Sequence, residues 1–269
     1  MSRIKILSGW SNVGGSTTAF INLCNLLNRE GYDCTFYGPH DWHLDKCKSG
    51  KLEQCPVNEE GERLIVHFLK FPSRPEESKK VILSCHEKEL YSVKHTKSFW
   101  DDIVFVSDTQ KDWHETSGIV IPNITPVIMR SVRSEEGPRV AGIIGSIDRN
   151  KRTHVSIKRA LDDGFEKIKL FGLIVDNLYW EEEVHPLVDG DRVVFEEYSD
   201  KNNMYSQVDE VYLSSASECA SLVATECYSL GIPFHGNENI DPVTEVLSSQ
   251  EIFSKWVGVL GLEKGNDNR

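Results

Sequence analysis

Two glutamates stand eight residues apart in the stretch SECASLVATECYSLGIP, residues 217–233. The side chains between them are mostly small or apolar, whereas an ordinary amphipathic helix keeps its acids on the wet face. A helix that begins near Ser221 would place Glu218 in the preceding loop and Glu226 within the helix. Both carboxylates would then reach toward one space. The spacing therefore predicts a pocket at the start of this helix.

A second candidate is an anion site in SGWSNVGGST, residues 8–17, which follows a predicted strand and opens a predicted helix. Gly14 and Gly15 would let the backbone approach a ligand, and the unpaired N–H groups of a helix start attract anions. The segment lacks the G-x-G-x-x-G pattern, so it does not indicate a bound dinucleotide. A plain tight turn explains the two glycines as well.

A third candidate is a basic cluster in GSIDRNKRTH, residues 145–154, which contains Arg149, Lys151 and Arg152. At the carboxyl end of a strand these cations would suit a diphosphate, with lysine as a point charge and arginine as a fork. A solvated first helical turn is the alternative.

Two further motifs are weaker. Asp189 and Asp191 flank a glycine and resemble the paired aspartates that hold a divalent metal, but their position before a strand is typical of a turn. We therefore predict no metal. His86 directly follows the apolar strand VILSC, at the edge where a parallel sheet binds ligands. An ordinary polar loop residue is the alternative there.

The composition limits the partners. A chain of 269 residues suits one large domain or two modest ones. Its net charge of −12 disfavours nucleic acid and anionic lipid, although a local basic groove is compatible with that total. No apolar run approaches the ~20 residues of a membrane span, and the N-terminus lacks the apolar core of a signal peptide. Seven cysteines without a C-x-x-C pair predict reduced thiols. We expect a cytoplasmic protein with no membrane span.

Short apolar runs alternate with helical patterns through most of the chain. The expected strands are 4–9, 34–38, 64–69, 80–85, 103–108, 118–123, 140–145, 167–172, 192–198, 210–215 and 232–236. The expected helices are 16–32, 153–164, 203–207, 221–231 and 242–262. The charged segment 130–139 carries Gly and Pro and is the expected linker. We predict two doubly wound α/β domains, 1–129 and 130–245, followed by a C-terminal helix and tail, 246–269.

The order of motifs resembles that of the GT-B glycosyltransferases of the family-4 (group 1) type. The motifs are the Gly-Gly turn, VSD (106–108), IPN (121–123), GSIDRNK (145–151), LFG (170–172) and SSASECASLVATECYSLGIP (214–233). The E-x7-E spacing and the Gly-Ile-Pro after it are the most specific, and the resemblance is firmest over 140–236. It implies an α/β fold of two Rossmann-like domains that face each other across a cleft. It also implies transfer of a sugar from a nucleotide-diphosphate sugar, with retention and without metal or other cofactor.

The resemblance also implies residue roles. Glu226 would bind the ribose hydroxyls, Glu218 would face the donor sugar, and Lys151 would neutralise the departing diphosphate. His86 would lie near the transferred sugar, so the implied catalytic residues are Glu218, His86 and Lys151. Donor binding is implied for Glu226, Arg149, Ser146, Gly14, Gly15 and the backbone N–H groups of Ser221, Leu222 and Val223.

One position departs from the family pattern. The family usually carries an arginine five residues before its lysine, and here Ser146 occupies that place. Arg149 and Arg152 are the candidates to replace it. The chain is also short for the family, and the acceptor is not indicated beyond a hydroxyl group, with a saccharide or glycan expected.

Three alternative functions stay open. A nucleotide-sugar epimerase would need further acids in the first domain, which the sequence does not indicate. A non-catalytic sugar-nucleotide binding module is compatible with Ser146. A DNA-modifying glycosyltransferase of the viral type would also be compact, but the net charge of −12 disfavours it.

Overall fold

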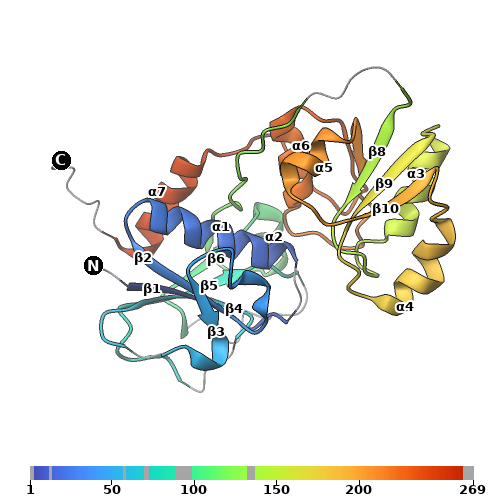
Figure 1. Ribbon diagram of the computed structural model, residues 1–269. Helices are drawn as coiled ribbons and strands as arrows, with labels where there is room; N and C mark the ends of the chain where they lie inside the picture. Colours follow the sequence, from blue (N-terminus) through green and yellow to red (C-terminus); the bar gives the residue numbers. More distant parts are fainter. Residues whose placement is uncertain are drawn as a thin grey trace. The chain divides into compact units, whose positions relative to one another are not determined.

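The computed structural model describes residues 3–11, 14–56, 59–69, 73–88, 99–131 and 137–262. Contacts divide the chain into two compact units, which we call the first and second domains and describe separately (Figure 1). The first contains residues up to Thr125 and those from Leu247 onward, and the second contains Pro126–Val246. Residues 132–136 of the predicted linker and residues 263–269 of the predicted tail lie outside the described residues.

The first domain is built on a parallel sheet with, in the described residues, seven strands in the order β3-β2-β1-β4-β5-β6-β7. The strands are β1 (Arg3–Ser8), β2 (Asp33–Gly38), β3 (Ser49–Lys51), β4 (Arg63–His67), β5 (Lys80–Cys85), β6 (Asp102–Phe105) and β7 (Ile119–Val120). Continuous apolar runs such as RLIVH are buried along their whole length, as expected for strands covered on both faces. The order changes direction at β1, which makes its carboxyl end a switch point.

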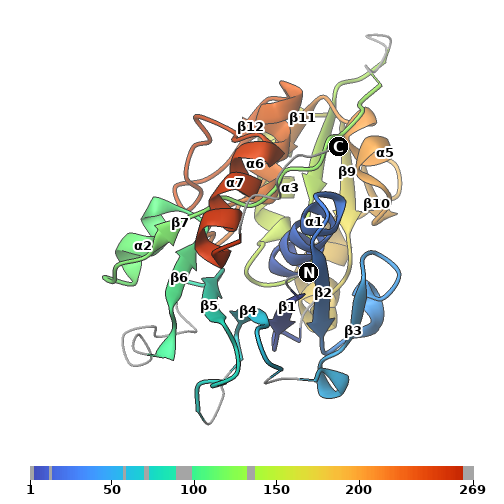
Figure 2. The same cartoon turned by 90° about the vertical axis from the view of Figure 1, so that its left-hand side faces the viewer.

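Two helices pack side by side on one face of this sheet. They are α1 (Gly15–Arg29) and α7 (Ser249–Leu260), which share one apolar core with β1 and β2 (Figure 2). A capping box between Ser248 and Glu251 starts α7. Buried Arg63 donates to the carbonyls of Leu260 (2.7 Å) and Gly261 (3.1 Å), so β4 holds the end of this C-terminal helix. The opposite face is covered by shorter segments, including η2 (Leu52–Gln54).

The second domain has, in its described part, a five-stranded parallel sheet in the order β10-β9-β8-β11-β12. The strands are β8 (Val140–Ile144), β9 (Lys167–Gly172), β10 (Val193–Glu197), β11 (Glu210–Tyr212) and β12 (Phe234–His235). One face is covered by α3 (Thr153–Asp162), α4 (Asn177–Tyr179) and the π turn that continues α4 (Trp180–Val184). The other face is covered by α5 (Lys201–Ser206) and α6 (Leu222–Leu230) (Figure 1). The domain is therefore doubly wound.

The predicted two-sheet α/β architecture is confirmed, with local differences. The helix predicted over 242–262 begins only at Ser249, because Ser248 supplies its N-cap. Several described elements were not predicted: β3, the short helix α2 (Asp108–Trp113), the 3-10 turns η1 (Asp41–His43) and η2, and the helical segment 177–187. That last segment carries three consecutive glutamates in its middle, which break the apolar period that sequence reading depends on.

The end of β9 requires glycine. A Cβ on Gly172 would lie 1.8 Å from the carbonyl oxygen of Gly145, the residue that opens the loop after β8. Gly172→Ala should lower the free energy of unfolding by about 1–3 kcal/mol, because backbone must shift to admit the methyl group. Gly258→Ala is the matched control: Gly258 lies exposed within α7 with nothing near its Cβ position. It should stabilise the protein by about 0.5–1 kcal/mol. Urea denaturation of both variants tests this, and equal effects would contradict it.

Candidate functional site

The second domain brings its candidate residues together where the strand order reverses. β8 lies between β9 and β11, so the loop after β8 (145–152) and the loop after β11 (213–221) leave the same edge of the sheet. Ligands of open parallel sheets bind at such a switch point. Asn150 joins the two loops: its carbonyl accepts from Ala216 N (2.7 Å), its Oδ1 accepts from Ser217 N (3.1 Å), and its Nδ2 donates to Ser217 O (3.2 Å).

Two of the predicted catalytic residues meet across these loops. Lys151 Nζ forms an ion pair with Glu218 Oε1, which also accepts a hydrogen bond from Ser215 Oγ at 2.7 Å. The Glu218 side chain is 10% exposed and that of Lys151 25% exposed. The pair therefore lies at the protein surface but is largely shielded from water, where charges interact more strongly than in bulk solvent.

The start of α6 lies directly beyond Glu218. Ser221 is its N-cap, and the Ser221 hydroxyl accepts from Ala224 N at 3.2 Å. Leu222 and Val223 belong to the first turn of α6, where backbone N–H groups have no acceptor within the helix. These two donors, with the helix dipole behind them, suit an anion. Ser221, Leu222 and Val223 thus form the start of α6, three to five residues after Glu218.

Glu226 is the second glutamate of the motif and is 1% exposed within α6. Its Oε1 is ion-paired with Lys201 Nζ and its Oε2 accepts from Tyr205 OH at 2.7 Å, both partners coming from α5. Burial, followed by the charge of Glu226, raises the pKa of Tyr205 well above its ordinary value and also raises the pKa of Tyr198. Sequence reasoning missed Lys201 and Tyr205, because neither belongs to a recognisable motif.

The loop after β8 is organised by Asp148 rather than by an arginine. Asp148 accepts from Ser146 Oγ (2.6 Å) and from Lys151 N (2.9 Å), which fixes the loop that carries the lysine. Arg149 points to other carboxylates, with Asp176 at 3.2 Å and Glu182 at 3.2 Å. Arg152 holds a left-handed backbone conformation at the start of α3.

The Asp189–Asp191 pair forms a turn. Asp189 Oδ1 accepts from the backbone N–H groups of Asp191 and Val193, both at 2.9 Å, and these bonds lower the pKa of Asp189. The turn interpretation of the sequence fits these contacts. Within the part of the chain that the structure describes, no group of three or more His, Cys, Asp or Glu side chains is placed to hold a metal.

The first domain has its own polar cluster at the carboxyl ends of β1, β4 and β5. Ser8 Oγ lies 2.9 Å from His67 Nδ1, and His67 Nε2 lies 2.8 Å from the Glu87 carboxylate. Hydrogen bonds from His67 lower the pKa of Glu87 although burial opposes this, so the carboxylate is ionised and His67 Nε2 donates to it. Trp10 N donates to Ser8 Oγ at 3.3 Å, so the cluster connects the loop after β1 with the loop after β5.

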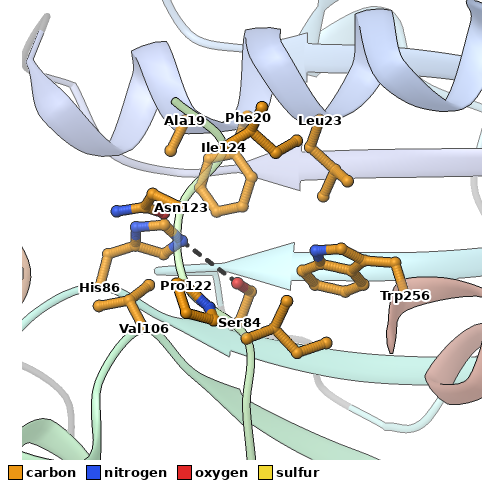
Figure 3. Close-up of a pocket in the computed structure, with 11 residues that line it drawn as sticks. Ala19, Phe20, Leu23, Ser84, His86, Val106, Pro122, Asn123, Ile124 and Trp256 are labelled. Atoms are coloured by element: carbon orange, nitrogen blue, oxygen red, sulfur yellow. Dashed lines mark hydrogen bonds between the residues drawn. The ribbon is translucent and has the colours of Figure 1, made fainter. Parts of the chain in front are cut away.

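His86 lies beside this cluster and lines a small cavity under α1. Figure 3 shows His86 and Asn123 at one end of the cavity and Trp256 of α7 at the other, with Phe20 above them. Ser84 Oγ lies 3.3 Å from His86 Nε2. Burial, and then the proximity of His67, lower the pKa of His86 to about 3. His86 is therefore a neutral imidazole near neutral pH.

The glycine turn is described only in part, because residues 12–13 lie outside the described residues. Gly14 is the N-cap of α1, and a Cβ built on it would meet no atom of the described residues within 4 Å. Gly15 is the first residue of α1 and is exposed.

Solved structures match nearly the whole chain at low sequence identity. TarM matches with a TM-score of 0.62 at 8% identity, covering 98% of this chain and 92% of TarM. Sucrose-phosphate synthase from Thermosynechococcus elongatus matches with 0.62 at 12% identity, covering 98% and 92%. Anabaena HepE in complex with UDP matches with 0.61 at 14% identity, covering 94% and 89%. This chain has the GT-B fold. No protein-family model and no curated sequence matches it.

The predicted GT-B resemblance is thereby confirmed at the level of fold. In this GT-B chain the second domain groups Lys151, Glu218 and the start of α6, and the first domain groups His86 with a buried cluster that the sequence did not indicate. His67 lies inside the expected strand 64–69, and only the structure shows that β4 ends at this residue. Among the described residues, no helix is long and apolar enough to cross a membrane.

The neutral state of His86 predicts a pH dependence of stability. The unfolded chain binds a proton on this histidine below about pH 6.5, whereas the folded chain does so only near pH 3. The unfolded state then binds more protons in this window, so stability falls as the pH falls, by about 1.4 kcal/mol per unit. His86→Gln should remove this slope between pH 6.5 and 5.

Urea denaturation followed by tryptophan fluorescence measures the first domain, because five of the six tryptophans lie there. His185→Gln, which replaces an exposed histidine of the second domain, is the control. Parallel curves for wild type and His86→Gln between pH 6.5 and 5 would contradict a neutral His86.

Proposed function

We propose that this chain is a retaining glycosyltransferase that moves a sugar from a nucleotide-diphosphate sugar to a hydroxyl acceptor, with a saccharide or glycan as the expected acceptor class. The supporting observation is the juxtaposition of Lys151, Glu218 and the start of α6 at the switch point of the second sheet. A cation and free backbone N–H groups suit a diphosphate, and the carboxylates suit sugar hydroxyls.

In the proposed reaction, the bond between the anomeric carbon and the diphosphate oxygen breaks. A bond from that carbon to the acceptor oxygen forms, and the acceptor proton leaves with the nucleotide diphosphate. Lys151 and the N–H groups of Leu222 and Val223 would neutralise the charge that develops on the leaving group, which lowers the barrier. Glu218 would face the sugar.

The other roles are proposals that rest on the family resemblance. Glu226 would accept hydrogen bonds from the ribose hydroxyls, His86 would contact the transferred sugar, and Gly14 and Gly15 would admit the donor to the first domain. A neutral His86 can both donate and accept a hydrogen bond, which suits a sugar hydroxyl. A nucleotide donor is also supported by similar structures, since HepE and an S. aureus TarM variant (TM-score 0.63, 9% identity, covering 98% and 93%) are both described with UDP.

A non-catalytic binding module is the second candidate. It is favoured by the absence of a cation at Ser146 and by the engagement of Arg149 with Asp176 and Glu182. Such a module would bind nucleotide sugars without turnover. For either function we propose a cytoplasmic location, which suits the cysteine pattern of the sequence.

A donor screen separates the two candidates. We expect the purified protein to release nucleotide from one of the UDP, GDP, ADP or CMP sugars when saccharide acceptors are present. Because the proposed site uses side-chain and backbone donors, release should continue in EDTA. Binding of a donor without release of nucleotide would favour the binding module. Loss of activity in EDTA that Mn²⁺ restores would indicate a metal site at Asp189 and Asp191. Transfer of sugar to duplex DNA alone would favour the DNA-modifying alternative.

The two glutamates should have separable effects. Glu226→Gln weakens acceptance of the ribose hydroxyls and should lower affinity for the nucleotide diphosphate by about 1.5–3 kcal/mol, the range for hydrogen bonds to charged groups. Glu218→Gln should abolish turnover but leave that affinity intact or improved, because Lys151 loses a competing carboxylate. Glu166→Gln, an exposed acid before β9, is the control.

Calorimetry with the nucleotide diphosphate and a turnover assay on the same proteins provide the two measurements. Parental affinity and parental rate in both glutamate variants would show that the E-x7-E motif of this chain is only part of a helix.

A further inference from the structure

We propose that Lys201 is a phosphate-contacting residue of the donor site, which exchanges its ion pair with Glu226 for the donor's phosphate when the donor binds. The proposal rests on the function proposed above and adds a residue that the family pattern does not supply. Lys201 is the first residue of α5, and its ammonium group is ion-paired with Glu226 Oε1. Its side chain is 20% exposed while that of Glu226 is 2% exposed, so the lysine lies between the carboxylate and solvent.

The reason for an exchange is access: the Glu226 side chain is 2% exposed, and each of its oxygens already faces a partner. Oε2 accepts from Tyr205 OH at 2.7 Å, and Oε1 is paired with Lys201. A ribose can reach this buried carboxylate only if one of these partners moves aside. Tyr205 is fully buried in the core between α5 and the sheet, so its ring is held in place. Lys201 is long, flexible and partly exposed, and it is the partner that can leave.

The displaced ammonium can then bind an anion, because a charge-assisted hydrogen bond to a phosphate oxygen replaces the ion pair that it gives up. The ligand itself brings that anion, since its diphosphate is attached to the same ribose. Two residues of the loop after β8 do not supply a cation for the phosphate. Ser146 carries no charge, and Arg149 is ion-paired with Asp176 and Glu182. Lys151 provides one cation beside Glu218, and Lys201 provides the second beside Glu226.

A simple Lys201 variant is a poor test, because it would leave Glu226 buried without its counter-charge and could unfold the domain. The sharper comparison is Glu226→Gln against the double variant Glu226→Gln with Lys201→Met. Both proteins carry the same uncharged residue at 226 and differ only in the lysine. Lys201→Arg, which keeps the charge, is a third protein that should retain phosphate binding.

The probes form a series that adds phosphates to one nucleoside: uridine, UMP and UDP, with the guanosine and adenosine series in parallel. We expect calorimetry to show that the double variant binds the nucleotide diphosphate at least tenfold more weakly than Glu226→Gln does. The two proteins should bind the nucleoside with affinities within about twofold. The tenfold difference should shrink at high salt, because it arises from a charge.

Equal affinities of these two variants for every probe would overturn the role of Lys201 while leaving the proposed function intact. A difference that is as large for the nucleoside as for the diphosphate would also overturn it, since Lys201 would then act through the fold or the base. If the wild-type protein binds no nucleotide of any series, the proposed function fails and this inference fails with it.

Discussion

The arrangement of the second domain depends on one buried charge, the carboxylate of Glu226. An ionised carboxylate that is 1% exposed needs a counter-charge and hydrogen bonds, because its loss of hydration is costly. Lys201 and Tyr205 supply both from α5, so they fix α5 against α6 on one face of the sheet. This packing holds the first turn of α6 beside Glu218 and Lys151. The Glu226 carboxylate, which is the proposed ribose contact, thus also holds α5 against α6.

The first domain also contains a shielded carboxylate, but a histidine holds it in place of a lysine and a tyrosine. Its carboxylate, Glu87, is held by His67 Nε2 at 2.8 Å, and Ser8 continues the chain of contacts to the loop after β1. The carbonyl of Glu87 accepts from Gln110 (3.2 Å) and His114 (3.0 Å), so both ends of the residue are held. The residue that follows His86 in the chain is therefore held at both its carboxylate and its carbonyl. The first domain thus places a neutral His86 beside a hydrogen-bonded carboxylate, whereas the second domain contains two lysine–glutamate ion pairs.

The sequence predicted the parts of this structure that local pattern determines. Apolar runs located β1, β4, β5, β8 and β9, and the E-x7-E stretch located α6, with Glu226 inside the helix and Glu218 before it. The partners of those acids were not predictable from pattern. Lys201 precedes Glu226 by 25 residues in a polar stretch, and Asn150 contacts Ser217 from 67 residues away. Such contacts depend on the order of the strands in the sheet, and the local pattern of apolar residues does not reveal that order. The packing of α7 on the first domain is a similar case, since Arg63 and Leu260 are 197 residues apart.

The paired charges also bear on selectivity. A protein with a net charge of −12 repels anions at long range, so its affinity for a nucleotide has to come from local contacts. Under the proposed exchange, free phosphate could take Lys201 only by leaving Glu226 buried without its counter-ion, and a nucleoside could take Glu226 only by leaving Lys201 unpaired. The first outcome leaves a buried carboxylate without its counter-charge, and the second gives up an ion pair without replacing it, so both are unfavourable. Only a ligand that carries both ribose hydroxyls and a phosphate satisfies both partners at once. The ion pair would therefore weaken binding of free phosphate and of nucleosides relative to binding of the whole nucleotide.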